Sequence, residues 1–123
     1  MDDLEPSTSL SSASARDDAL RRWAYGSLPL MAGVEMLLGS TVKAALWPVL
    51  VRDSQHGPWL DTAGGHHTLL ESALSGGETR AGLLVLELAD VPTGVALGDL
   101  LCGIDPRNLA VFQRAVRVIG GGA

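Results

Sequence analysis

The stretch SGGETRAGLLVLELA, residues 75–89, decides the fold of this chain. Ser75 precedes Glu78 by three residues, the spacing of a capping box in which the serine and glutamate side chains each accept a backbone N–H at a helix start. The segment from Leu83 to Leu88 is mostly apolar, so periodicity alone leaves a buried strand as the alternative to a buried helix. The capping box and the leucine content favour a central buried helix.

A second stretch, DPRNLAVFQRAVRVIG at residues 105–120, predicts an amphipathic helix with both ends marked. Asp105 is a helix-capping residue, and Pro106 suits the first helical position because its missing N–H would have no partner there. Gly120 predicts the end of this helix. The apolar residues that fall at helical spacing form its predicted buried stripe: Leu109, Phe112, Val116 and Ile119.

Length and composition predict one mainly helical domain. A chain of 123 residues is long enough for one core and buries roughly two-thirds of the surface that its unfolded form exposes. Its 46% apolar content comes mostly from Leu, Ala and Val, and Leu and Ala lose little side-chain freedom in a helix. We therefore expect a mainly α fold, a compact helical domain of five or six helices with one short β-hairpin.

Three segments follow from the composition along the chain. Residues 1–14 are rich in serine and carry little apolar surface, which predicts a disordered N-terminal tail. Ser14 marks the predicted start of the first helix, and residues 15–120 form the predicted single helical domain. Residues 121–123 are expected to be a flexible C-terminus.

Turn and cap residues place the remaining elements. Ser27 and Pro29 predict the start of a second helix, which Gly39-Ser40 ends. The β-branched run Trp47–Val51 and the segment Pro58–Leu60 predict the two strands of the hairpin, with a turn at residues 53–57. Trp47 and Trp59 would then face each other across it. A short helix is expected over residues 66–73, and a short helix or a turn over residues 95–102.

Charge and cysteine content restrict the partners and the compartment. The net charge of −5 argues against nucleic acid as a partner, because binding to phosphate backbones needs clustered cations. One cysteine, Cys102, cannot form an internal disulfide, which fits a reducing compartment. The sequence has no apolar run of 18 residues, and the acidic start Met1-Asp2-Asp3 is unlike a signal peptide. We expect a soluble cytoplasmic protein that does not enter a membrane.

Two segments resemble parts of a known ATPase family. Residues 74–78, Leu-Ser-Gly-Gly-Glu, resemble the signature motif of ABC-type ATPases, and residues 103–108 are similar to the stretch around their D-loop. The resemblance implies an anion site at Ser75, Gly76 and Gly77, because in that family this helix start holds a γ-phosphate from the opposite subunit. Free N–H groups and the helix dipole favour an anion at such a position.

The sequence departs from that family where the chemistry is done. It contains no G-x-x-x-x-G-K-[ST] loop, and Lys43, the only lysine, has no glycine-rich loop before it. No apolar strand ending in Asp-Glu precedes residue 103, where the chain offers only Asp99. A chain without a phosphate cradle and magnesium ligands cannot hydrolyse ATP alone. The other interpretation of residues 75–78 is a capped helix start and nothing more.

A wider resemblance covers about residues 20–120. Residues 23–30 and 33–38 are similar to the start of small uncharacterised helical proteins of high-GC Gram-positive bacteria and their mobile elements. Residues 74–78, 99–100, 103–105 and 108–110 resemble their later pattern. This resemblance implies a helical fold and no particular chemistry.

Catalytic and metal-binding patterns are not found in the sequence. His66 and His67 are adjacent and would point about 100° apart on a helix, and no C-x-x-C or H-E-x-x-H spacing accompanies them. No G-x-S-x-G motif is present, and a lone cysteine such as Cys102 is usually part of a core. We therefore expect no catalytic residue, no metal and no cofactor.

The remaining candidate residues concern interaction. The hypothesis is a non-enzymatic protein-interaction or regulatory module whose partner is another protein or a second copy of the chain. Two alternatives stay open: a degenerate anion- or nucleotide-responsive domain using Ser75 to Glu78, and a DNA-binding regulator using the last helix. The residues of the predicted interaction face are Arg107, Arg114, Arg117, Trp47 and Trp59.

Overall fold

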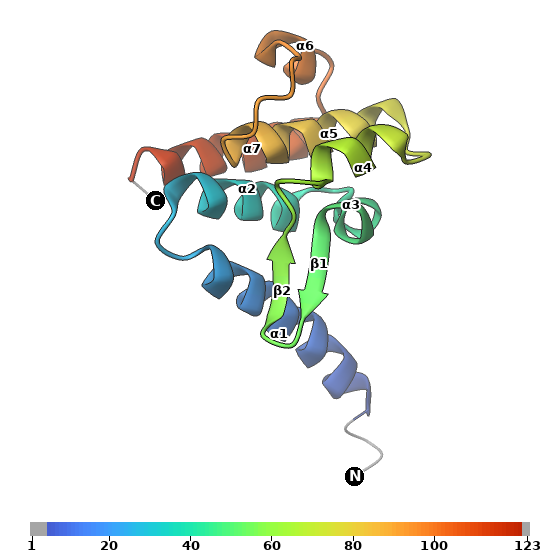
Figure 1. The fold of residues 1–123 in the computed structure, drawn as a ribbon, viewed down its shortest axis with the longest axis vertical. Helices are drawn as coiled ribbons and strands as arrows, with labels where there is room; N and C mark the ends of the chain where they lie inside the picture. The colour runs from blue at the N-terminus through green and yellow to red at the C-terminus, as the bar shows by residue number, and fades with distance from the viewer. Residues whose placement is uncertain (1–4, 122–123) are drawn as a thin grey trace.

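A computed structural model describes the backbone of residues 5–121 and the side chains of residues 13–121. Over this range the chain is mainly α, with seven helices and one antiparallel hairpin (Figure 1). The predicted fold class is confirmed, with one helix more than the upper predicted number. The elements are α1 (Glu5–Ala24), α2 (Leu28–Gly39), α3 (Lys43–Leu50), β1 (Val51–Ser54), β2 (Gly57–Leu60), α4 (Gly65–Glu71), α5 (Gly76–Leu88), α6 (Leu97–Leu101) and α7 (Pro106–Ile119).

The helix starts predicted at Ser75 and Asp105 are present. The Oγ of Ser75 accepts the N–H of Glu78 at 3.1 Å, and the Oε1 of Glu78 accepts the N–H of Ser75 at 2.8 Å, which completes the capping box. The segment 83–88 therefore belongs to a helix and not to a strand. At α7, the Oδ1 of Asp105 accepts the N–H of Arg107 at 2.7 Å, with Pro106 at the first helical position.

The first helix begins earlier than predicted. Its backbone is helical from Glu5, whereas the capping pattern placed the start at Ser14. The boundary between tail and domain predicted at residue 14 is therefore not visible in the backbone. Residues 1–4 of the predicted tail (residues 1–14) and residues 122–123 of the predicted flexible C-terminus (residues 121–123) lie outside the described residues.

The hairpin lies further along the chain than predicted. Residues 47–50, taken as most of the first strand, form the second half of α3, and β1 begins only at Val51. A short apolar run fits a buried helix as well as a buried strand, and α3 keeps Pro48 in its interior although proline removes one helical hydrogen bond. In the observed register Arg52 pairs with Trp59, so Trp47 does not face Trp59 across the hairpin.

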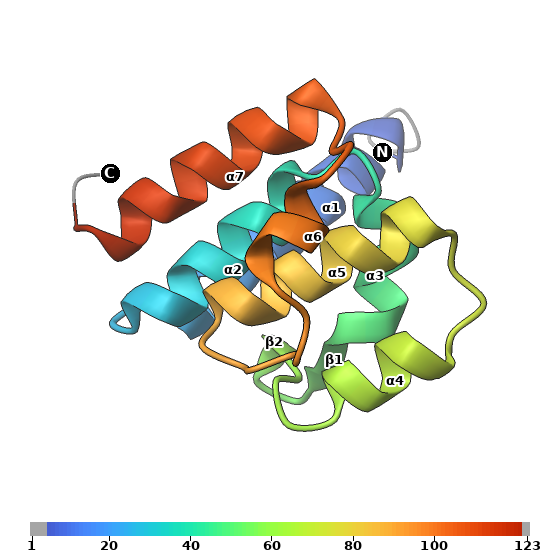
Figure 2. The same ribbon diagram turned by 90° about the horizontal axis from the view of Figure 1, so that it is seen from above.

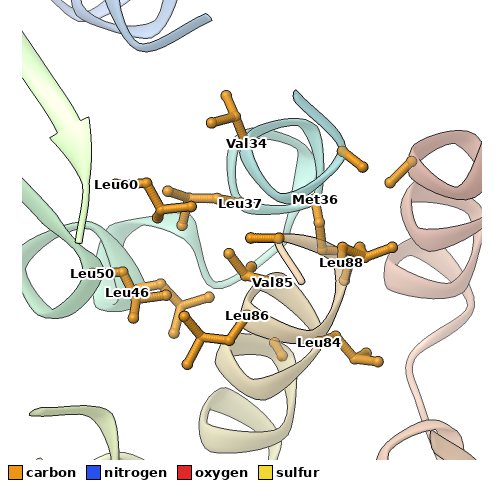
Figure 3. Close-up of a cluster of buried hydrophobic side chains, with 14 of the residues drawn as sticks. Val34, Met36, Leu37, Leu46, Leu50, Leu60, Leu84, Val85, Leu86 and Leu88 are labelled. Carbon is orange, nitrogen blue, oxygen red and sulfur yellow. The ribbon is translucent and has the colours of Figure 1, made fainter. Parts of the chain in front are cut away.

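The core is built around α2, which lies between α7 and α5 in the view from above (Figure 2). The hairpin and α1 pack on the opposite side of α2 from α6 (Figure 1). Close packing of α2 on α5 requires a glycine, because a Cβ atom on Gly33 would lie 3.0 Å from both Ala89 Cβ and the Val85 carbonyl oxygen. The largest fully buried side chains of this core include Val34, Met36, Leu37, Leu46, Leu50, Leu60, Leu84, Val85 and Leu86 (Figure 3).

The predicted buried stripe of α7 is wrong. Three of its four residues are exposed, with relative accessibilities of 36% for Leu109, 45% for Val116 and 40% for Ile119, and Phe112 is only partly buried. The face that packs on α2 instead carries three smaller or polar residues: Asn108, Val111 and Ala115.

These small side chains let α2 and α7 approach closely. The polar side chain of Asn108 finds a hydrogen-bond partner at this contact. Its Oδ1 accepts the backbone N–H of Thr41 at 2.9 Å, which ties α7 to the turn after α2. A buried amide with a hydrogen-bond partner carries little of the penalty of burying a polar group.

Among the helices of the described part of the chain, none has the length and apolarity needed to cross a membrane.

Candidate functional site

One hollow on the described surface is a groove of about 620 Å³ lined by residues of α1, α2 and α7. We call it the α2 groove. Its floor is formed by Met31, Val34 and Leu38 of α2. These residues are spaced three and four apart, so they lie in one row along the helix. Met31 and Leu38 are partly exposed, whereas Val34 between them is fully buried, so the apolar surface that α2 presents in the groove comes from Met31 and Leu38.

One wall of the α2 groove comes from α7. Val111 and Val118 extend the apolar surface, and Arg114 and Arg117 line the groove beside them. Both arginines are exposed, and within residues 13–121 neither forms an ion pair. This wall therefore presents two positive charges next to the apolar floor.

The other wall comes from the end of α1, where Arg21 is already engaged. Its Nε lies 2.9 Å from Glu35 Oε2, and its Nη1 lies 3.2 Å from Asp18 Oδ1. These hydrogen bonds, that to Glu35 first, raise the pKa of Arg21 above its ordinary value. Glu35 is the one acidic residue among those lining the groove, and its carboxylate forms an ion pair with Arg21. The charges of the groove that have no ion-pair partner within residues 13–121 are therefore positive, although the net charge of the chain is −5.

The segments that resemble the ATPase motifs lie together in a second, smaller hollow of about 280 Å³. Ser75 and Gly77 line it from the start of α5, and Asp105 lines it from the start of α7. The Ser75 hydroxyl already accepts the N–H of Glu78, and the carboxylates of Glu78 and Asp105 border the same hollow. An anion bound there would meet two negative charges and, among the lining residues, the single cation of Arg80.

The predicted interaction residues do not lie in one place. Arg114 and Arg117 line the α2 groove, whereas Arg107 is exposed in the first turn of α7 and is not among the groove residues. Trp59 is half-buried on β2.

Trp47 packs against the first helix. Its ring lies under two cations, with Arg16 Cζ 5.0 Å and Lys43 Nζ 5.8 Å from the ring centroid. Lys43 Nζ also lies 2.7 Å from Asp17 Oδ2, so the tryptophan, the lysine and α1 form one contact. Trp47 therefore holds α3 against α1 and does not contribute to the α2 groove.

The histidines and the cysteine are dispersed. His67 Nε2 lies 3.3 Å from Glu71 Oε2 on the exposed side of α4, and Cys102 is exposed after α6. Within the described residues no three His, Cys, Asp or Glu side chains are grouped so that they could hold a metal ion.

Sequence reasoning missed the α2 groove. The helical spacing of Met31, Val34 and Leu38 predicts a helix, but it does not show that this side of the helix borders a groove. The available signal was the excess of apolar residues in α2: of its 12 residues only Glu35 is charged. A helix that is apolar all round needs cover on every side.

Comparisons with protein families, with curated proteins and with solved structures each found no match.

Proposed function

We propose that this chain is a non-enzymatic protein-interaction or regulatory module that binds its partner protein through the α2 groove. The observation that carries the proposal is the combination of the apolar floor of α2 with two arginines of α7 that have no ion-pair partner within residues 13–121. Exposed apolar strips bordered by polar residues mark protein contacts, and arginine is enriched in such contacts because its stem is apolar and its head is charged.

The chemistry of the lining favours binding over catalysis. Its residues include no serine, cysteine or histidine, and Glu35 is held by Arg21. General acid–base or nucleophilic catalysis needs a free base or an activated nucleophile at the reacting atom. The carboxylate of Glu35 is already paired, and the guanidinium groups of Arg114 and Arg117 have no ion-pair partner within residues 13–121. Such a groove is suited to binding the surface of another protein.

Site-specific photo-crosslinking tests this proposal. A photoreactive amino acid replaces Leu38 in the groove floor, and in a matched control it replaces Leu70, which is exposed on α4 outside the groove. The captured protein is then purified and its affinity for the chain is measured by calorimetry. We expect capture from position 38 and not from position 70, followed by binding of the purified pair; equal capture at both positions, or no binding, would contradict the proposal. Light scattering of the chain alone tests whether the partner is a second copy.

A second candidate function is an anion- or nucleotide-responsive domain. The observation that favours it is the hollow that Ser75 and Gly77 share with Asp105, in which two motif-like segments meet. Amide NMR spectra recorded with inorganic phosphate and with ATP test it. Shifts confined to Gly76 and Gly77 would support it, and shifts no larger than those of Gly98, which lies on α6 and does not line this hollow, would eliminate it.

A further inference from the structure

We propose that the α2 groove binds an acidic amphipathic helix of the partner, laid along α2 between α1 and α7. This inference rests on the proposed function and adds the shape and the charge of the partner. It follows from three properties of the groove: the spacing of its residues, its openness and its unbalanced charge.

The lining residues recur at one-turn spacing on α2 and α7. They lie at 31, 34, 35, 38 and 39 on α2 and at 111, 114, 117 and 118 on α7, with Arg21 on α1 and Tyr25 directly after it. Residues three and four apart share one side of a helix, so each set forms a row along its axis. The row on α2 spans two turns, about 10 Å at 1.5 Å per residue.

A row of this kind is complementary to another helix. Figure 2 shows α7 running alongside α2, so the groove between their rows is elongated. A helix that presents apolar side chains at i and i+7 would place them against Met31 and Leu38, which are seven residues apart and partly exposed. The incoming helix would pack on α1, α2 and α7 as the fourth member of a bundle.

The openness of the groove favours a helix over a small amphiphilic molecule. Its volume of about 620 Å³ is compatible with either occupant. Small-molecule sites, however, bury most of the ligand surface. Tyr25, at the end of the α1 wall, is 82% exposed, so the groove is not closed at this end.

The charge of the wall formed by α7 selects an acidic helix. Arg114 and Arg117 are three residues apart and exposed, and within the described residues no carboxylate pairs with either. Glu or Asp side chains one turn apart on the incoming helix would meet both guanidinium groups, which bind carboxylates through paired hydrogen bonds. Since the rest of the chain is acidic, the acidic residues of the partner would be confined to the flank that faces α7.

Selection from a phage-displayed library of helical miniproteins with randomised surface positions tests the inference directly. The wild-type chain is the bait, and counter-selection uses the Leu38→Asp variant. We expect binders that carry leucine-like residues at helical spacing and Asp or Glu on one flank. The dissociation constant of these binders should rise on the order of tenfold for the double variant Arg114→Glu/Arg117→Glu. Replacing the acidic residues of the binder by lysine should restore its affinity for that variant.

Arg107→Glu is the matched control, because it reverses a charge on the same helix outside the groove and should change the affinity less than twofold. Circular dichroism confirms that each variant is folded. Binders without acidic residues, or binders that tolerate both charge reversals, would overturn the inference. One-to-one binding of dodecanoate without any selected helix would also overturn it, because it would assign the groove to a small molecule.

The two proposals fail in distinguishable ways. If position 38 crosslinks to a partner through a basic or non-helical segment, the interaction function stands and the acidic helix is wrong. If acidic helices are selected but position 38 captures no partner in cells, the chemistry of the groove is as inferred and the interaction function is wrong.

Discussion

A Cβ atom on Gly39 would lie 2.7 Å from Cγ1 of Val111, closer than two such carbon atoms approach in proteins. Gly39 is the last residue of α2, and Val111 lies on the buried face of α7. Both residues also line the α2 groove. The distance between α2 and α7, and with it the width of the groove, therefore depends on the absence of a side chain at position 39.

Gly39→Ala is expected to destabilise the fold by about 1–3 kcal/mol, because the added methyl group must displace a short, β-branched side chain in a packed contact. The gain in helix propensity, up to about 1 kcal/mol, offsets only part of this cost. Gly77→Ala is the control, since a Cβ there meets no atom within 4 Å, and it should be neutral or stabilising. Urea unfolding of both variants measures the difference, and equal stabilities would refute the close contact.

The loop after α5 is held by Glu87, and this contact should make stability depend on pH. Glu87 Oε1 accepts the Oγ–H of Thr93 at 2.6 Å and its backbone N–H at 3.0 Å. These bonds, the side-chain bond first, lower the pKa of Glu87 below its ordinary value of 4.5. A lowered pKa in the folded state adds stability that is present above pH 4.5 and is lost as the pH falls through the lowered value.

Glu87→Gln should therefore reduce the free energy of unfolding by about 1 kcal/mol at pH 7, because a charge-assisted hydrogen bond becomes a neutral one. The difference from wild type should disappear in strongly acidic solution. Thr93→Val should return the pKa of Glu87 towards 4.5 in a carbon-detected NMR titration. A constant difference between wild type and Glu87→Gln across this pH range would show that the ionised carboxylate does not hold the loop.

The capping box at α5 should contribute about 1 kcal/mol to the free energy of unfolding. Ser75→Ala removes the oxygen that accepts the Glu78 N–H, and such replacements cost about 0.5–2 kcal/mol. Ser75→Gly should cost only a few tenths, because glycine suits the extended backbone of a cap and leaves the donor to water. Thermal unfolding of the two variants separates the cap from general effects of substitution; a larger loss for glycine than for alanine would contradict this account.

The starts of α2, α5 and α7 were predictable from the sequence, but the start of α1 and the buried face of α7 were not. Caps depend on residues a few positions apart, so Ser75 and Asp105 marked their helices locally. Two rows on α7 share the same spacing, one from Leu109 and one from Asn108, and the larger apolar residues favoured the first. The second row is buried because close packing on α2 needs small side chains and because Thr41 offers the Asn108 amide a partner, and both conditions involve residues far away in the sequence.

The α2 groove and the start of the hairpin also depend on residues far apart in the sequence, so they could not be predicted from local patterns. The apolar run after residue 46 fits a strand or a helix, and contacts of Trp47 with α1 accompany the helix. The groove requires three helices to be placed relative to one another, and only its wall residues Arg114 and Arg117 were recognised as candidates for interaction. Their relation to the floor of α2 could not be inferred from the spacing within either helix.

The contacts of α1 with α3 and β1 give a final prediction, because they contain two ion pairs of different burial. Lys43 and Asp17 are 2.7 Å apart with side chains 31% and 22% exposed, whereas Arg16 and Asp53 are 2.9 Å apart with side chains 47% and 68% exposed. Exposed pairs contribute about 0.2–1 kcal/mol, since water and salt screen them. The less exposed pair is screened less, so its coupling energy should be the larger of the two.

Double-mutant cycles measure both couplings by urea unfolding, with Lys43→Met and Asp17→Asn for one pair and Arg16→Met and Asp53→Asn for the other. We expect about 1 kcal/mol for Lys43 with Asp17 and a few tenths for Arg16 with Asp53, and the smaller value should vanish first as salt is added. Trp47→Leu should weaken both couplings, because the ring positions both cations. Equal couplings that are insensitive to Trp47→Leu would mean that α1 is held on α3 by apolar packing alone.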